Sequence, residues 1–192
     1  MRKDGGYTGV WRPGVGEQHW VGGFDHDDFK QRDTEYFKKG LRLVAMHISN
    51  DEYTGVWRPG AGEQHWHTGL GFDEFKQKDK EYFDKGLRLI TMESRYGGDG
   101  IKFMGVWRPG TGAQRWWTEG GDKFDEFKKK DLEHFNQGLR LIAFPPYGLN
   151  AIWHPGSGDQ WVKFAVSLDE FKKADKEYFE QGLRLVDLSV GA

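Results

Sequence analysis

The chain of 192 residues contains no cysteine, only 6 prolines and only 36% apolar residues. The absence of cysteine excludes disulfides and thiolate metal sites, and it leaves both a cytosolic and a secreted location open. No apolar run approaches the ~18 residues of a membrane-spanning helix, and no apolar signal segment follows the first residues. Lys and Arg total 28 against 30 Asp and Glu. The resulting net charge of -2 provides no basic field for nucleic acid or for an anionic membrane.

Aromatic residues and glycine, in contrast, are abundant. Aromatics make up 16% of the chain, with 9 Trp, and there are 28 Gly. We therefore expect a core built from a few large rings rather than from many aliphatic side chains. The length suits one compact domain with a real core, so we predict a single domain over residues 1–192.

Two short motifs recur four times and define a tandem repeat. Trp-Arg-Pro-Gly begins at Trp11, Trp57 and Trp107 and returns as Trp-His-Pro-Gly at Trp153, while Gly-Leu-Arg-Leu begins at Gly40, Gly86, Gly138 and Gly182. The period is about 46 residues, lengthened between copies two and three by an insert around residues 96–100. The copies span approximately residues 7–52, 53–102, 103–148 and 149–192.

Each copy has the same predicted plan, seen most clearly in copy two. Large and small side chains alternate over 53–57, which predicts a half-buried strand. The Pro-Gly segment 58–62 predicts a turn, and a second strand follows at 63–67. Residues 73–85 begin with acids and end before a glycine, as helices do, and 87–92 reads as a third strand.

The two ends of the chain complement each other. Copy one opens at Tyr7 without the strand that should precede it, and the chain closes with that strand at 183–190. An open array would leave both half-hairpins as bare edges, which proteins avoid. We therefore predict a mainly β fold with one helix per repeat, closed into a four-bladed, propeller-like ring whose termini pair in one blade. The alternative is an open arc of stacked repeats.

One face of every predicted helix carries Phe, Asp and Phe at i, i+4 and i+8. An Asp among aromatic rings is costly to bury alone, and each copy supplies an Arg a few residues later. We interpret the two as a structural Asp–Arg pair, because four equal acids do not form one paired acid/base site. The stripes are Phe29/Asp33/Phe37, Phe75/Asp79/Phe83, Phe127/Asp131/Phe135 and Phe171/Asp175/Phe179, with Arg42, Arg88, Arg140 and Arg184.

A glutamine lies seven residues after each motif Trp, at Gln18, Gln64, Gln114 and Gln160. We favour a structural latch for it over a ligand contact, since an amide can donate and accept at once. Two positions further on lie Trp20, Trp66 and Trp116, and in copy four the ring moves to Trp161. His19 and His65 match between copies, but no three or four ligands converge, so no metal site and no cofactor are predicted.

The ordered motifs Gly-Leu-Arg-Leu, Tyr-x-Gly-Val-Trp and an Asp-x-Phe helix, seen at Leu41-Arg42-Leu43 and Tyr53–Trp57, resemble a bacterial tandem repeat family. That family is related to the N-terminal repeat domain of fungal polyglycine hydrolases, and the resemblance extends from Tyr7 to Val190. In those hydrolases the repeats precede a serine hydrolase domain whose nucleophile lies in Ser-x-x-Lys. The chain contains no Ser-x-x-Lys, so the resemblance implies the accessory part and not the catalytic part.

These patterns favour a non-catalytic module that recognises a protein surface or a saccharide, with no catalytic residues. Equivalent loops of a closed ring lie on one face, and their Arg and Trp side chains could anchor a ligand. The candidate binding residues are Arg12, Arg58, Arg108, His154, Trp20, Trp66, Trp116 and Trp161. A scaffolding domain without a small ligand is the alternative, and a hydrolase ranks third because no nucleophile and base pair stands out. We expect a monomer whose partner is a saccharide or a cell-surface protein.

Overall fold

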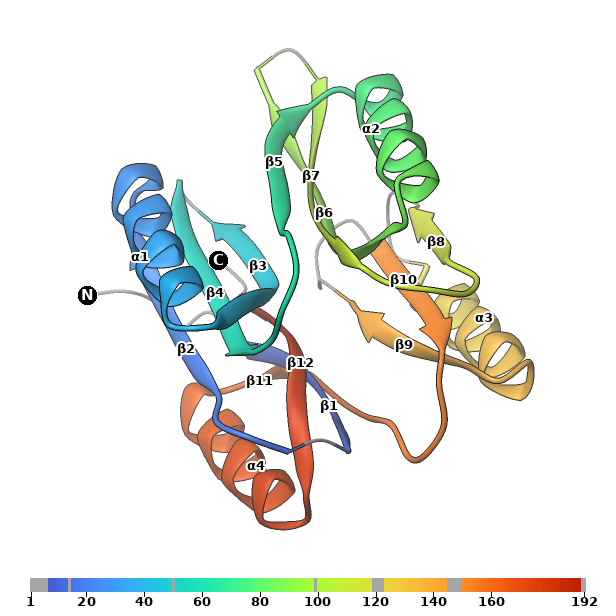
Figure 1. Cartoon of the computed structure of the whole chain (residues 1–192). Helices are drawn as coiled ribbons and strands as arrows, with labels where there is room; N and C mark the ends of the chain where they lie inside the picture. Colours follow the sequence, from blue (N-terminus) through green and yellow to red (C-terminus); the bar gives the residue numbers. More distant parts are fainter. Residues whose placement is uncertain are drawn as a thin grey trace. The chain divides into compact units, whose positions relative to one another are not determined.

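A computed structural model describes residues 7–13, 15–49, 51–98, 100–118, 123–144 and 150–190. Within these ranges the chain forms four helices and twelve strands (Figure 1). In the first half these are β1 (Tyr7–Pro13), β2 (His19–Phe24), α1 (His26–Lys38), β3 (Leu41–Ser49), β4 (Glu52–Pro59), β5 (His65–Leu70), α2 (Phe72–Asp84) and β6 (Leu87–Gly97). In the second half they are β7 (Gly100–Pro109), β8 (Arg115–Thr118), α3 (Phe124–Asn136), β9 (Leu139–Ala143), β10 (Asn150–Pro155), β11 (Trp161–Val166), α4 (Leu168–Glu180) and β12 (Leu183–Val190).

The strands form four antiparallel sheets of three, which agrees with four repeats. The sheet orders are β2-β4-β3, β5-β7-β6, β8-β10-β9 and β11-β1-β12. The middle strand of each sheet is the Gly-Val-Trp strand, or its Ala-Ile-Trp counterpart in β10, so every sheet borrows this strand from the next copy of the sequence. We number repeats one to four by their helices α1 to α4.

The four sheets are grouped in two compact units. The first contains residues 1–61 and 158–192 and therefore repeats one and four, and the second contains 62–157 with repeats two and three. None of the helices in the described ranges is long and apolar enough to cross a membrane.

The helices begin and end where the sequence predicts. Asp25 caps α1 by accepting from the amide of Asp28 at 2.8 Å, and Ser167 forms a capping box with Glu170 at the start of α4. Beyond each C-terminal end stands a glycine with a φ of +79° to +84°, which side chains strongly disfavour. These glycines are Gly40, Gly86, Gly138 and Gly182.

The pairing predicted for the two ends of the chain is confirmed. β1 lies between β11 and β12, and its register with β12 places Tyr7 opposite Val190 and Pro13 opposite Leu183. Both of its edges are therefore hydrogen-bonded inside the sheet of repeat four. Residues at opposite ends of the sequence complete one folding unit.

The Pro-Gly segment is not a hairpin turn between sheet neighbours. In the second compact unit, residues 110–114 connect β7 of one sheet to β8 of another, and in the first unit β1 and β2, which follow each other along the chain, likewise belong to different sheets. Local sequence indicates a change of direction here, but strand pairing depends on the partners that meet in space.

The core consists of large rings, as the composition predicts. The motif residues Trp11, Trp57, Trp107 and Trp153 have no exposed surface, and each packs against the first Phe of its helix stripe. In repeat two the Trp107 and Phe75 centroids are 5.6 Å apart at 44°. Such tilted contacts add to the free energy of area burial.

A glycine lies two residues before Trp11, Trp57 and Trp107, whereas Ala151 takes this position before Trp153. At Gly105 the absence of a side chain lets the ring pack against the backbone. A Cβ added at Gly105 would lie 2.6 Å from the Trp107 ring, 2.9 Å from Leu89 and 3.0 Å from Phe75. We expect Gly105→Ala to lower the free energy of unfolding by about 1–3 kcal/mol, because a packed core accommodates extra volume poorly. Gly98→Ala is the matched control, since no atom lies within 4 Å of its added Cβ. Urea unfolding of both variants measures the difference, and equal midpoints would show that Gly105 is not sterically required.

Candidate functional site

The helix Asp is bound by indole groups. Nε1 of the motif Trp donates to the Asp of its own repeat in all four cases: Trp57 to Asp33 at 2.9 Å, Trp107 to Asp79 at 3.0 Å, Trp153 to Asp131 at 2.9 Å and Trp11 to Asp175 at 2.7 Å. Each carboxylate thus accepts a hydrogen bond from an uncharged donor. The bond fixes the helix to the middle strand of its sheet.

In the second compact unit, Asp79 also joins two repeats. Its carboxylate accepts from Nε2 of Gln114 at 3.0 and 3.1 Å and from Nε1 of Trp116 at 3.0 Å. Gln114 in turn accepts the amide of Leu89 through Oε1 at 2.7 Å. We call Asp79, Trp107, Gln114 and Trp116 the joint, since β8 and its linker thereby bind the helix of the preceding repeat.

The same arrangement recurs in the first compact unit around Asp175. Gln18 donates to its carboxylate at 3.3 Å and accepts the amide of Leu185 at 3.1 Å. Trp20 packs edge-on against Phe171, with centroids 6.2 Å apart. The latch role predicted for glutamine is therefore confirmed at Gln18 and Gln114.

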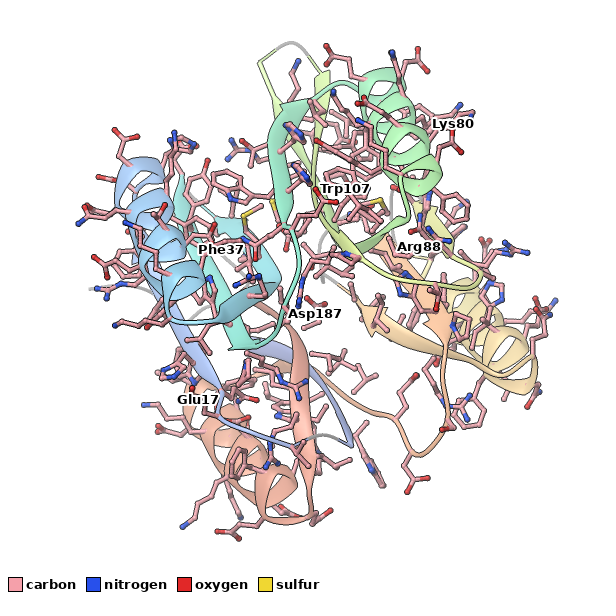
Figure 2. The ribbon with its side chains drawn as sticks, viewed as in Figure 1. Glu17, Phe37, Lys80, Arg88, Trp107 and Asp187 are labelled. Atoms are coloured by element: carbon pink, nitrogen blue, oxygen red, sulfur yellow. The ribbon has the colours of Figure 1, made fainter. Side chains whose placement is uncertain are left out.

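The predicted Asp–Arg pair is wrong for Asp79 and Arg88. Arg88, which is labelled in Figure 2, instead stacks its guanidinium on Phe83, 3.6 Å from the ring centroid. It donates to the carbonyls of Phe83, Leu87 and Gly112 at 3.3, 2.8 and 2.9 Å. Arg184 makes the equivalent contacts with Phe179, Leu183 and Gly16. The Arg satisfies the C-terminal carbonyls of its helix, where the helix dipole favours a cation.

The stacked rings are partly exposed in every repeat. Phe37, Phe83, Phe135 and Phe179 retain 37–41% of their surface, with an Arg 3.6–3.7 Å from each ring centroid. We call each such pair an Arg–Phe site. The sequence showed both residues, but their i, i+5 relation crosses the helix end, so only the folded chain places them together.

The candidate Arg side chains of the Pro-Gly segment are half-buried at Arg58 and Arg108, as is His154. Arg58 donates to the carbonyl of Val15 at 3.4 Å, and its pKa is lowered, first by burial and second by the charge of Arg184. The strand register places Arg58 opposite Arg42 and Arg108 opposite Arg88. These positions therefore lie beside the Arg–Phe sites. The side chain of Arg12 is outside the described part of the chain.

The candidate Trp side chains differ in exposure. Trp20, Trp66 and Trp116 are half-buried, and Trp116 is used in the joint. Trp161, in contrast, is 50% exposed and stacks on Tyr178 with centroids 6.0 Å apart at 20°. Among the four rings, Trp161 alone presents a large apolar surface to solvent.

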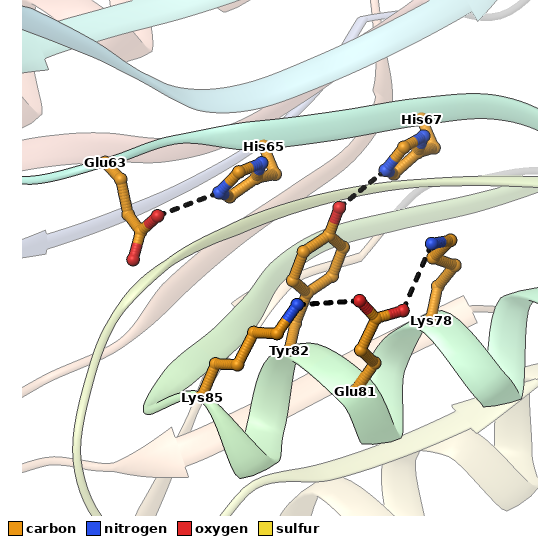
Figure 3. Close-up of polar contacts among 7 residues, drawn as sticks. All are labelled: Glu63, His65, His67, Lys78, Glu81, Tyr82 and Lys85. Atoms are coloured by element: carbon orange, nitrogen blue, oxygen red, sulfur yellow. Dashed lines mark hydrogen bonds and ion pairs between the residues drawn. The ribbon is translucent and has the colours of Figure 1, made fainter.

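Sequence reasoning missed a second recurring feature, a planar side chain stacked on the helix Tyr. In repeat two, His65 lies on Tyr82 with centroids 4.9 Å apart, and His67 Nε2 hydrogen-bonds the Tyr82 hydroxyl at 2.7 Å (Figure 3). Burial, followed by the charge of Lys78, lowers the pKa of His67. The matching His positions gave a signal in the sequence, but their Tyr partner lies in another element.

The helix Asp and the stacked His of repeat two are both hydrogen-bonded to aromatic side chains. Asp79 accepts a hydrogen bond from Nε1 of Trp107, and Nε2 of His67 lies 2.7 Å from the hydroxyl of Tyr82. Within the described ranges, no three His, Asp or Glu side chains converge as metal ligands.

The fold and joints define a tandem-repeat protein whose unit is a three-stranded sheet with one helix. Residues 63–109 and 158–192 match the family described as polyglycine hydrolase-like, structural repeat, so the predicted family relation is confirmed. The first segment comprises β5, α2, β6 and β7, one complete repeat, and the second lacks only β1, which the start of the chain supplies. No curated protein matches the chain.

Proposed function

We propose that the chain is a non-catalytic recognition module that binds a protein surface or a saccharide through several equivalent sites. The observation that carries this proposal is the fourfold Arg–Phe site. A single exposed Phe is ordinary on a protein surface. Four rings at the same position with nearly equal exposure, each next to an Arg, provide repeated apolar and cationic contacts.

The neighbouring strand adds a second basic group to each site. The residue opposite the Arg of the Arg–Phe site is Arg58 in repeat one, Arg108 in repeat two, His154 in repeat three and Arg12 in repeat four. Guanidinium groups bind carboxylates and hydroxyls, while an exposed ring contributes apolar contact. Individually weak sites on one body gain avidity towards a repetitive polymer or a cell surface.

We further propose that the repeats close into a four-bladed ring, with an open arc as the alternative. The support is the bond by which a linker Gln donates to the helix Asp of the preceding repeat within each compact unit, Gln114 to Asp79 and Gln18 to Asp175. Gln64, in the linker that follows β4, and Trp66, in β5, hold the same repeat positions as Gln114 and Trp116. A closed ring would set the equivalent sites on one face.

Scaffolding without a small ligand is the second candidate function. It is favoured by the use of Arg88, which donates to three backbone carbonyls and so stabilises the helix end and the linker. In this alternative the Arg–Phe site only stabilises the fold, and its partial exposure reflects its place at the end of a helix.

The test replaces Arg12, Arg58 and Arg108 with Ala together and measures binding to immobilised polysaccharides, bacterial and fungal cell walls and acidic proteins. We expect the parent to bind at least one of these and the triple variant to bind about tenfold more weakly, because three of the four sites lose one of their two basic residues. The matched control replaces three exposed lysines, Lys80, Lys128 and Lys176, which changes the net charge equally. Scaffolding is favoured if the parent binds nothing, or if the two triple variants bind alike.

A further inference from the structure

In repeats one and two, the helix Tyr is covered by a His that is paired with a Glu, and two cations lie near its ring. In repeat two, His65 stacks on Tyr82 and is held by Glu63 at 2.9 Å, while Lys78 and Lys85 lie 5.9 and 5.8 Å from the Tyr82 ring centroid (Figure 3). In repeat one the corresponding set is His19 on Tyr36, paired with Glu17, and flanked by Arg32 and Lys39 at 5.7 and 5.9 Å. Each Tyr therefore lies near two cations, one from its own helix and one from the residue that follows the helix.

The flanking cations are also neutralised by nearby acids. Glu81 pairs with Lys78 at 3.1 Å and with Lys85 at 2.7 Å, and these bonds lower its pKa to about 2. The pKa of Lys85 is raised, mainly by its hydrogen bond to Glu81, with a smaller contribution from the charge of Glu63. Lys85 thus interacts with two carboxylates, one from the helix and one from the segment before β5. The two lysines beside the Tyr82 ring are therefore paired with carboxylates of the same protein.

Repeat four keeps the acids and loses the cations. Ala174 and Gln181 stand where repeat two has Lys78 and Lys85, whereas Glu177 and Asp159 retain the two carboxylates. Gln181 donates to Glu177 over a long distance of 3.4 Å. Exposed Asp159 makes no ion pair or hydrogen bond with any residue that the structure describes.

The stacked imidazole is replaced as well. Trp161 occupies the position of His65 and lies on Tyr178, which itself packs edge-on against buried Trp11 with centroids 5.2 Å apart. The indole is thus supported from below, and it retains 50% of its surface in solvent. A Trp ring provides the strongest aromatic attraction for a cation. We call Trp161, Tyr178, Asp159 and Glu177 the repeat-four slot.

We propose that the repeat-four slot binds a lysine or arginine side chain of a partner polypeptide, with the cation on the open face of Trp161 and close to the two carboxylates. The partner would thereby supply the charge that Lys78 and Lys85 supply within repeat two. Arginine fits best, because its planar guanidinium can stack on the indole and fork to a carboxylate. The slot has the opposite charge preference to the Arg–Phe sites and does not depend on them.

The experiment follows the indole Nε1–H signal of Trp161 by NMR, assigned by its loss in Trp161→Phe, during titration with a blocked tetra-arginine peptide. The same peptide built from citrulline keeps the planar group but lacks the charge. We expect a saturable shift with the arginine peptide that weakens as salt is added, and at least about tenfold weaker binding of the citrulline peptide.

Two variants test the internal replacement of the cation. Gln181→Lys restores the lysine of repeat two and should weaken binding of the arginine peptide at least about tenfold, because an internal ammonium then competes for the acids. Gln137→Lys places the same charge at the equivalent position of repeat three and should leave binding within about twofold. Both positions are exposed, so neither variant is expected to unfold the protein.

Three results would overturn the proposal: no shift of the Trp161 signal, equal binding of the citrulline peptide, or undiminished binding by Gln181→Lys. Glycan binding that Trp161→Ala abolishes and Gln181→Lys leaves intact would assign the slot to a neutral sugar instead, and would also overturn it. The recognition function of the Arg–Phe sites is scored separately by the Arg12, Arg58 and Arg108 variant. Each idea can therefore fail while the other stands.

Discussion

Replacing Asp79 with alanine should lower the free energy of unfolding of the second compact unit by roughly 3–5 kcal/mol. The carboxylate accepts from Trp107, Gln114 and Trp116, and its side chain is only 9% exposed. Each buried donor left without a partner costs about 1–3 kcal/mol, and some water can reach the half-buried Gln114 and Trp116. The change would loosen the helix from its own sheet and from the next repeat together.

Urea unfolding monitored by circular dichroism measures this effect. Asp84→Ala, an exposed residue paired only with Lys80 on the surface, should change stability by at most about 1 kcal/mol. Asp79→Asn should fall between the two, since one amide oxygen still accepts while the NH₂ group faces other donors. A variant Asp79→Ala as stable as Asp84→Ala would mean that the joint contributes nothing to folding.

Deleting Leu183–Ala192 should abolish cooperative folding of the first compact unit. The deletion removes β12, whose Leu183, Leu185 and Leu188 are buried in the core of that unit, and it leaves β1 with one unpaired edge. Fully burying each leucine contributes about 1.5–3 kcal/mol, so the loss is comparable to the whole stability of a typical domain. The bare edge should also promote self-association.

Thermal unfolding and analytical ultracentrifugation test this expectation. Leu185→Ala, which keeps the strand but empties part of the core, should cost only about 2–5 kcal/mol and leave a monomer. A peptide of residues 183–190 added to the truncated chain should partly restore the fold by pairing with β1 again. A truncated protein with the melting temperature and monomeric state of its parent contradicts the structural role of the terminal pairing and the ring proposal with it.

Sequence reasoning was accurate where the signal is local or periodic. The helix over 73–85 agrees with α2, Phe72–Asp84, because acids, a Phe/Asp/Phe stripe and a terminal glycine all point to one structure. It was wrong about the partner of Asp79, for which Arg88 was chosen because an Arg recurs at this position in every copy. Indole and amide donors from the next strand and linker reach the carboxylate first, and sequence distance carries no information about them.

In the candidate site, too, the sequence predicts some features and only the structure shows the others. Trp161 could be found because copy four shifts its ring by one position, yet the shift alone does not reveal that the ring stays in solvent. The exposed indole of Trp161 lies on Tyr178, which comes from another element. In the structure, Trp116 is instead partly buried and bound to Asp79.

By itself, the sequence determined the four repeats, the single helix in each, the aromatic core and the pairing of the two ends, since repetition, 3.6- and 2-residue periods and a missing strand are properties of order along the chain. Only the tertiary structure decided which donors satisfy the helix Asp, that each sheet takes its middle strand from the next copy, and which Trp remains exposed. Those outcomes depend on which groups meet at hydrogen-bonding distance once residues far apart in sequence are packed together, because a buried polar group takes the donors that reach it in space.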